Sequence, residues 1–201
     1  PLTGQVNLQF GTGTITNTTT SYPAPYGNYW WGARQQNIYR ANEVLGACLS
    51  PGANTITTIA WDVTNVNASQ PLANFVILMG QTLQTDASSW VGGLTTVFSA
   101  ATYTPSLGWN THVLTTPFAW DGVSNIVVET CSQNSTYTTN CSFNQTATSF
   151  VSTRLFRQDA VATCANAGVT STHSQRANTR FDFSSGSILP TQYQANQTNL
   201  S

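Results

Sequence analysis

Two histidines, His112 and His173, are the side chains that a catalytic mechanism would draw on first in this sequence. A nucleophilic triad needs a Ser or Cys, a base and an orienting acid that converge in space. The sequence contains no Gly-x-Ser-x-Gly motif. His112 falls in an expected strand and His173 in a loop rich in Ser and Thr, where a surface or hydrogen-bonded role is the simpler explanation. We therefore predict that the chain has no catalytic residues and is not an enzyme.

The acidic residues are almost as sparse, with seven in 201 residues. Glycoside hydrolysis uses two carboxyl groups in distinct environments, and Asp121 and Glu129 are close in sequence. Asp121, however, lies in a Trp-Asp-Gly turn, where an Asp side chain ordinarily accepts hydrogen bonds from nearby backbone N–H groups. Glu129 is expected to pair with an arginine. No Asp-x-Asp pattern indicates a calcium loop. We predict no metal site and no cofactor, with a structural ion held by carbonyl groups and an isolated Asp as the alternative.

The four cysteines, Cys48, Cys131, Cys141 and Cys164, show no C-x-x-C spacing, which argues against zinc and redox motifs. Cys131 and Cys141 flank a polar segment, 132–140, and this spacing favours a bridge across a hairpin, with Cys48 then joined to Cys164. Four cysteines allow three pairings, and some of them being buried free thiols is the alternative. Together with the absence of lysine, the cysteines favour an oxidising compartment.

Aromatic side chains gather in one expected loop, residues 26–32. Sugar faces stack on exposed Trp and Tyr rings, so Tyr29, Trp30 and Trp31 are the candidate ligand-binding residues. In an extended chain, Trp30 and Trp31 point to opposite faces, so one can belong to the core while the other is exposed. The alternative is that these rings plug an end of the fold or form contacts between subunits.

The elements that position these residues are predicted to be strands almost throughout. Short runs rich in Val, Ile, Thr and aromatic residues alternate with clusters of Gly, Pro, Asn and Ser, which is typical of a sandwich or barrel. In residues 55–63, Ile59, Trp61 and Val63 share one face at period two. Residues 74–79 are apolar on both faces and indicate a central strand. The other expected strands are 6–15 (one strand or a hairpin), 94–100, 111–115, 125–130, 150–157 and 179–183, with one short helix at 39–45.

About eight or nine strands, at most one short helix and no helical crossovers predict an all-β fold, an antiparallel and jelly-roll-like β-sandwich. We assign the sandwich to residues 25–183, after a Thr-rich segment, 1–24, and before a polar tail, 184–201. The two ends are interpreted as frayed termini or as strands added to a neighbouring copy, because unpaired sheet edges accept extended chains. No segment approaches the roughly 18 apolar residues of a membrane helix, so no membrane span is expected. The start at Pro1 is interpreted as a mature form without its targeting segment, or as a piece of a longer chain.

The expected surface is nearly uncharged. Only 6% of the residues are charged and the net charge is −1, where an ordinary globular chain has about 25% charged residues. All six cations are arginines. A small net charge removes the repulsion that keeps copies of a protein apart. The sequence also lacks the clustered cations that nucleic-acid binding requires. Copies of the chain itself are therefore expected partners, and nucleic acids are not.

Six motifs occur in one order along the chain: YGNYWWG at 26–32, NIYRANEVL at 37–45, TIAWDV at 58–63, GWNTHVLTTPFAWDG at 108–122, SNIVVETC at 124–131 and RANTRF at 176–181. This series resembles a β-sandwich module that recurs in large secreted and cell-surface proteins of Bacteroidota-like bacteria. The resemblance covers about residues 25–183 and departs at Ala177, where a proline is expected. It implies an extracellular or cell-surface location and no known chemistry, since such modules serve as spacers, adhesive units or assembly units.

These observations favour two functions. The first is an extracellular structural subunit that self-assembles into a filament, tube or surface layer, with β-strand exchange through a terminal segment as one way to join the copies. The low charge and the Thr-rich, β-prone end motivate it. The alternative is a carbohydrate-binding or adhesive module of a bacterial surface protein that binds glycans through Tyr29, Trp30 or Trp31.

Overall fold

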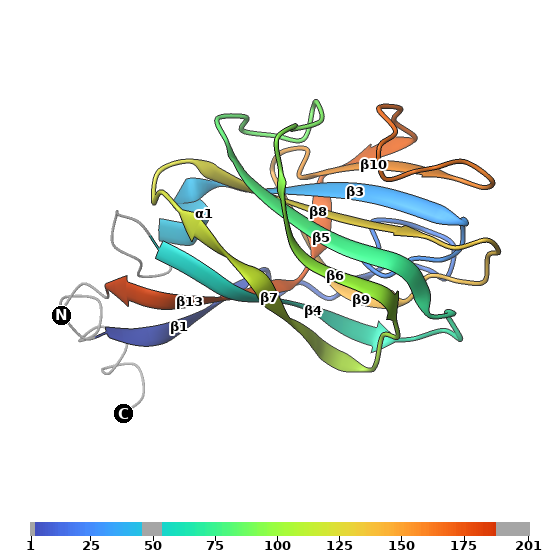
Figure 1. Ribbon diagram of the computed structural model, residues 1–201, viewed down its shortest axis with the longest axis horizontal. Coiled ribbons are helices and arrows are strands. Elements are labelled where there is room, and N and C mark those ends of the chain that lie inside the picture. Colours follow the sequence, from blue (N-terminus) through green and yellow to red (C-terminus); the bar gives the residue numbers. More distant parts are fainter. Residues whose placement is uncertain (1–2, 46–53, 188–201) are drawn as a thin grey trace.

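A computed structural model describes residues 3–45 and 54–187 of the chain, and two antiparallel sheets pack face to face in it (Figure 1). The prediction of an all-β sandwich is confirmed. In the described part of the chain the elements are β1 (Thr3–Phe10), β2 (Ile15–Thr16), β3 (Gly32–Tyr39), α1 (Ala41–Leu45), β4 (Asn54–Asn65), β5 (Leu72–Thr82), β6 (Thr95–Tyr103), β7 (Gly108–Trp120), β8 (Asn125–Gln133), β9 (Ser142–Ala147), β10 (Thr153–Gln158), β11 (Ser171–His173), β12 (Gln175–Ala177) and β13 (Thr179–Ser187).

The first sheet has the order β1-β13-β4-β9-β12, with β7 also paired to β4 and β2 to β9. The second sheet has the order β11-β10-β3-β8-β5-β6. The strand expected at 74–79 is β5, which lies between β8 and β6, so its central position is confirmed. The face predicted for Ile59, Trp61 and Val63 is confirmed as well, because all three side chains are buried in the core.

The prediction missed β3 and β9, whose sequences are largely polar. In β3 the side chains of Gln35, Gln36 and Asn37 are each 1% exposed, so no alternation of apolar and polar residues marks the strand. Each side chain has at least one hydrogen-bond partner, although Nε2 of Gln35 has none among the described residues: Ala24 N–H donates to Gln35, Gln36 donates to the Val91 carbonyl, and Thr153 donates to Asn37. Buried amides are tolerated when they are bonded in this way. The short helix expected at 39–45 is present as α1.

The N-terminal segment is part of the first sheet. β1 pairs with β13 of the same chain, and its Leu8 and Phe10 side chains belong to the core. β2 pairs with β9. At the other end, β13 continues to Ser187, and the rest of the polar tail lies outside the described residues. The sheet therefore extends beyond residues 25–183 on both sides. In the described residues, no helix is both long and apolar enough to span a membrane.

An aromatic cluster fills the core around Tyr26 and His112, both nearly inaccessible to solvent. The Tyr26 hydroxyl lies 2.6 Å from Nε2 of His112, and Nδ1 of His112 has no hydrogen-bond partner. Burial lowers the pKa of His112 from 6.5 to about 4, because a protonated imidazole would lose its hydration there. His112 is therefore a neutral core residue. The rings within reach of it belong to Tyr26, Trp61, Phe75, Phe98 and Tyr103.

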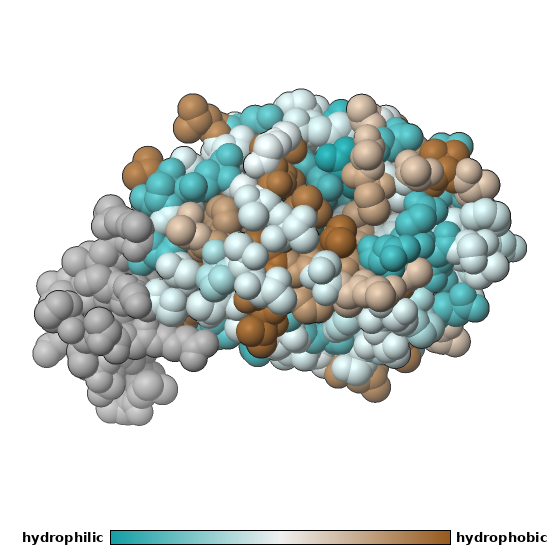
Figure 2. Space-filling model, in the orientation of Figure 1, coloured by the Kyte–Doolittle hydropathy of each residue, from teal (hydrophilic) through white to brown (hydrophobic). Residues whose placement is uncertain are grey.

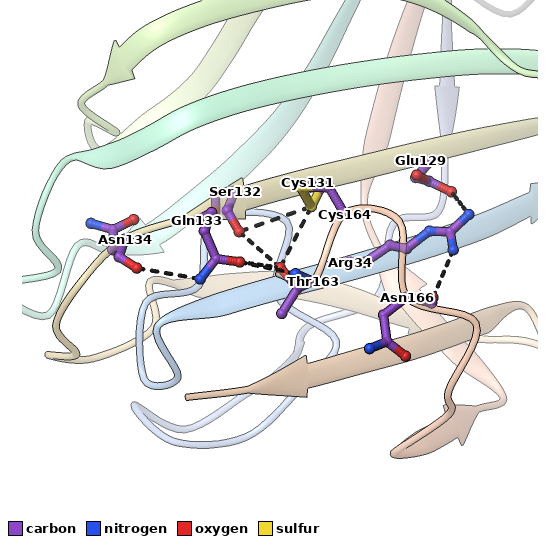
Figure 3. Close-up of a disulfide and its surroundings, with 9 residues drawn as sticks. All are labelled: Arg34, Glu129, Cys131, Ser132, Gln133, Asn134, Thr163, Cys164 and Asn166. Atoms are coloured by element: carbon purple, nitrogen blue, oxygen red, sulfur yellow. Dashed lines mark hydrogen bonds and ion pairs between the residues drawn. A yellow bond between two sulfur atoms is a disulfide. The ribbon is translucent and has the colours of Figure 1, made fainter. Parts of the chain in front are cut away.

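The disulfide joins Cys131 to Cys164, so the predicted pairing of Cys131 with Cys141 is wrong (Figure 3). The segment between Cys131 and Cys141 is not a hairpin within one sheet. It carries the chain from β8 in the second sheet to β9 in the first, which separates the two cysteines. Cys141 is a buried free thiol. The predicted partner of Cys164, Cys48, lies outside the described residues.

The disulfide fastens the connection at 159–170 to the second sheet. Next to it, the Thr163 hydroxyl donates to Oε1 of Gln133, and Nη1 of Arg34 donates to the Asn166 carbonyl (Figure 3). The expected pairing of Glu129 with an arginine is confirmed, since its carboxylate lies 2.9 Å from Arg34. The connection is thus held by one covalent bond and by neighbouring polar contacts.

We expect the free energy of unfolding to fall as the pH is lowered from about 6.5 to about 4. In the unfolded chain His112 binds a proton near its ordinary pKa of 6.5, whereas in the folded chain it does so only near pH 4. Protonation therefore favours the unfolded state across this window. The loss should reach about 3 kcal/mol at pH 4. Urea unfolding, followed by Trp fluorescence at several pH values, measures it.

His112→Gln should remove most of this pH dependence, because the amide can still bond to Tyr26 but does not titrate. His173→Gln is the matched control. Burial, and then the charge of Arg157, lower the pKa of His173 too, but this side chain is only half-buried, so most of the pH dependence should remain. A wild-type protein with constant stability between pH 6.5 and 4 would contradict the role of His112.

Removing the disulfide with Cys131→Ser and Cys164→Ser together should destabilise the fold by about 3–4 kcal/mol. A bridge across 33 residues restricts the unfolded chain by about that amount. Thermal unfolding with and without a reducing agent gives the same comparison in the wild type. Cys141→Ala serves as the control, and its response to the reducing agent should match the wild type. If the reducing agent changes the unfolding temperature of neither the wild type nor Cys141→Ala, the bridge contributes no stability.

Candidate ligand-binding site

An aromatic pocket of about 190 Å³ opens at the end of the sandwich where β3 begins. It is lined by Tyr29, Trp30, Tyr137 and Asp159. These residues come from three connections: the segment before β3, the crossing from β8 to β9, and the segment after β10. The disulfide and its neighbours hold the last of these in place. The pocket is therefore assembled from parts of the chain that lie far apart in sequence.

The three rings stand as walls around this space. The Tyr29 ring centre lies 6.1 Å from that of Trp30 and 6.4 Å from that of Tyr137. The planes meet at 87° and 76°, so both neighbours are nearly perpendicular to Tyr29. Perpendicular rings offer a ligand the edge of one ring and the face of another. Trp30 also packs against the main core, which fixes its position.

Buried amides fix the two loops that carry the tyrosines. The Tyr29 N–H donates to Oδ1 of Asn140 over 3.0 Å. The Asn28 side chain donates to the Thr136 carbonyl and accepts a hydrogen bond from the Thr138 hydroxyl. Asn28 and Asn140 are both fully buried. Because these amides are fully engaged with the loops on either side, they hold both loops in one arrangement.

Asp159 places one carboxylate in the pocket. Its Oδ1 accepts the Trp31 N–H at 2.9 Å, while Oδ2 has no hydrogen-bond partner within the described ranges. The next residue, Ala160, has a φ of 56°, in the left-handed region that residues other than Gly seldom adopt. This conformation turns the chain directly after Asp159. The arrangement gives three aromatic walls and one free acceptor, which suits a ligand with apolar C–H faces and hydroxyl donors.

The structure brings together two of the three residues predicted from sequence. Tyr29 and Trp30 line the pocket, whereas Trp31 is half-buried and does not line it. Sequence reasoning missed Tyr137 and Asp159. Tyr137 is a single aromatic residue in a polar crossing and is 59% exposed. An isolated aromatic residue among Ser and Thr was the one available signal for it, and nothing in the spacing pointed to Asp159.

The other residues considered for chemistry lie apart from this pocket. His112 is in the core, and Nε2 of His173 lies 3.0 Å from the Ser171 hydroxyl on the short strand β11. No carboxylate in the described residues bonds to this pair. Asp121 accepts the N–H groups of Val123 and Ser124, which confirms its expected role in a turn. Over the same part of the chain, no three His, Cys, Asp or Glu side chains are close enough to hold a metal ion.

A scan of protein-family models and a search of curated proteins return no match to this chain. The resemblance to the Bacteroidota module therefore remains a prediction from the motifs, and the pocket geometry is the basis for a functional proposal.

Proposed function

We propose that the chain is a binding module of a secreted or cell-surface protein and that its aromatic pocket holds one ring of a neutral sugar. One observation carries the proposal. Three aromatic side chains line the same pocket as Asp159, whose Oδ2 has no hydrogen-bond partner in the described residues. Sugars present C–H faces, which pack on aromatic rings, and hydroxyl groups, which donate to a carboxylate.

The charge of the pocket supports a neutral ligand. The only charged side chain among its lining residues is Asp159, so no lining cation balances the charge of an acidic sugar. A carboxylate close to a second negative charge is unfavourable in a partly buried site. The cavity of about 190 Å³ is smaller than most pockets for drug-sized ligands. We therefore expect a single ring to enter and the affinity to be on the order of 1 mM.

Two features support the extracellular part of the proposal. Disulfides persist in oxidising compartments, and the bridge between Cys131 and Cys164 fastens a connection that helps to form the pocket. The sequence motifs imply the same location through their resemblance to secreted modules.

A glycan array followed by NMR titration tests the proposal. We expect a neutral glycan to bind and expect Trp30→Ala, Tyr137→Ala and Asp159→Asn each to weaken binding about tenfold or more, because each removes a contact worth about 1.4 kcal/mol. Trp109→Ala is the matched control. This Trp stacks on Arg180 in a different part of the molecule, so its loss should leave binding unchanged.

Two results would overturn the sugar assignment. One is the absence of binding by every neutral glycan on the array. The other is binding of choline in place of a sugar, since aromatic rings with a carboxylate can also hold a quaternary ammonium group.

Self-assembly is a second candidate, and the position of β1 favours it. Among the described strands β1 pairs only with β13, so its outer edge is open to a strand from another copy. Hydrophilic residues and scattered hydrophobic ones share the face shown in Figure 2, and the low net charge of −1 opposes association little. A strand from a neighbouring copy could pair along this open edge.

We expect polymers or higher oligomers at high concentration, detected by light scattering and negative-stain microscopy. Asn7→Lys should reduce them, because Lys on an edge strand disfavours pairing with further strands. Asn7 is exposed and bonds to Asp182, an interaction that Lys can replace, so the fold should persist. Thr104→Lys, at an exposed position between β6 and β7, is the control with the same added charge. A wild-type protein that stays monomeric at high concentration would exclude this candidate.

A further inference from the structure

A second cavity, of about 280 Å³, lies at the opposite end of β3 and β9 from the aromatic pocket. Trp30 lines the aromatic pocket just before β3, and Arg40 lines the second cavity just after it. Figure 1 shows β3 running along the length of the molecule to α1. The second cavity is walled by α1 and by the connection from β9 to β10. The two cavities are therefore separate sites.

Two of the charged side chains at this cavity, Arg176 and Glu43, form an ion pair with each other. Arg176 is 4% exposed, and its guanidinium donates to the Ile38 carbonyl and to both carboxylate oxygens of Glu43. Oε2 of Glu43 also accepts the Arg40 N–H over 2.7 Å. The carboxylate is thus fully engaged, and the charges of Arg176 and Glu43 compensate one another.

Arg40 places at the same cavity a positive charge that forms no ion pair within the described residues. Its Nε donates to the Thr85 carbonyl over 2.7 Å, and its guanidinium lies 3.6 Å from the Phe150 ring centre. Its terminal nitrogens have no hydrogen-bond partner in the described parts of the chain. Asp86 is close enough to interact with the charge of Arg40, but it forms no ion pair with it and its carboxylate accepts the Ser88 N–H.

The guanidinium of Arg40 is held in a fixed orientation by these two contacts. The hydrogen bond at Nε and the contact with the ring restrain the guanidinium and leave its two terminal nitrogens available. A guanidinium with two free nitrogens matches the two oxygens of a carboxylate. Asn42 and Ser149, which also line the cavity, are exposed and have no side-chain partner within the described residues. They can bond to the remainder of a ligand.

We infer that this cavity is a carboxylate-binding site in which Arg40 pairs with the carboxylate of a small ligand. The net charge of its three ionised lining residues, Arg40, Arg176 and Glu43, is +1, opposite in sign to that of the aromatic pocket. An acidic sugar and the C-terminal carboxylate of a peptide both carry the required group. The inference is independent of the function proposed for the aromatic pocket.

Titration of the ¹⁵N-labelled protein at low salt tests the inference with D-glucuronate and with N-acetyl-dialanine. D-glucose and the amidated dipeptide are the neutral counterparts. At least one acid should shift the resonances of Arg40, Asn42 and Ser149 with a dissociation constant on the order of 1 mM, and its counterpart should not. The acid that binds identifies the source of the carboxylate. Failure of both acids to bind, or equal shifts from acid and counterpart, would overturn the inference.

Arg40→Gln should weaken binding of the acid about tenfold or more, and Arg40→Lys should weaken it less, because Lys keeps the charge but loses the planar fork. Arg180→Gln is the matched control, since Arg180 also stacks on an aromatic ring, at 3.8 Å from Trp109, but does not line the cavity. Circular dichroism checks that each variant is folded. Equal loss in Arg40→Gln and Arg180→Gln would show nonspecific attraction and overturn the site.

Trp30→Ala separates this inference from the function proposed for the aromatic pocket. It should leave binding of the acid unchanged, and Arg40→Gln should leave binding of a neutral glycan unchanged. Loss of acid binding in folded Trp30→Ala would place the acid in the aromatic pocket and contradict the inference.

Discussion

The arrangement of loops at the pocket end of the sandwich depends on the hydrogen bonds of one buried amide, Asn140. Its Nδ2 donates to the Ser21 carbonyl and its Oδ1 accepts the Tyr29 N–H. Its backbone N–H donates to Thr19, and its carbonyl accepts a hydrogen bond from Asn67. Three connections meet at this residue, just before β9 begins. A buried amide left without these partners would be unfavourable, so the position of each connection restrains the others.

These buried amides offer a second explanation for the low share of charged residues in the sequence. The scarcity of charge suggested a neutral surface suited to self-association, yet many of the amides lie inside the fold. A bonded amide is much less unfavourable to bury than an ion, so a chain that places polar connections and whole polar strands in its interior is expected to use Asn and Gln. The low charge is therefore partly a requirement of the fold. The Asn and Gln residues buried in this way are Asn17, Asn28, Gln35, Gln36, Asn37, Asn54, Asn110, Asn140, Gln145 and Asn178.

The same chemistry explains how far the sequence could predict the structure. The apolar strands β4 and β5 follow patterns that burial imposes directly. β3 does not, because Gln36 is buried by hydrogen bonding to partners from other strands and loops. The spacing of Cys131 and Cys141 resembles a hairpin, and only the crossing between sheets separates them. In the pocket, Tyr29 and Trp30 could be predicted from local composition. Asp159 could not, because its role depends on where a distant connection is fastened.

The absence of lysine has a structural counterpart in the six arginines. Every arginine lies against an aromatic ring, and the pairs are Arg34 and Arg154 with Trp90, Arg40 with Phe150, Arg157 with Tyr22, Arg176 with Tyr39, and Arg180 with Trp109. A planar guanidinium is weakly hydrated and stacks on a ring while its edge donates hydrogen bonds, whereas an ammonium group is strongly hydrated and does neither as well. Lysine at these positions would keep the charge and lose the stacking. The arginine side chains of this chain thus pack against aromatic rings as well as carrying charge. Such packing favours arginine over lysine, which is consistent with a composition that lacks lysine.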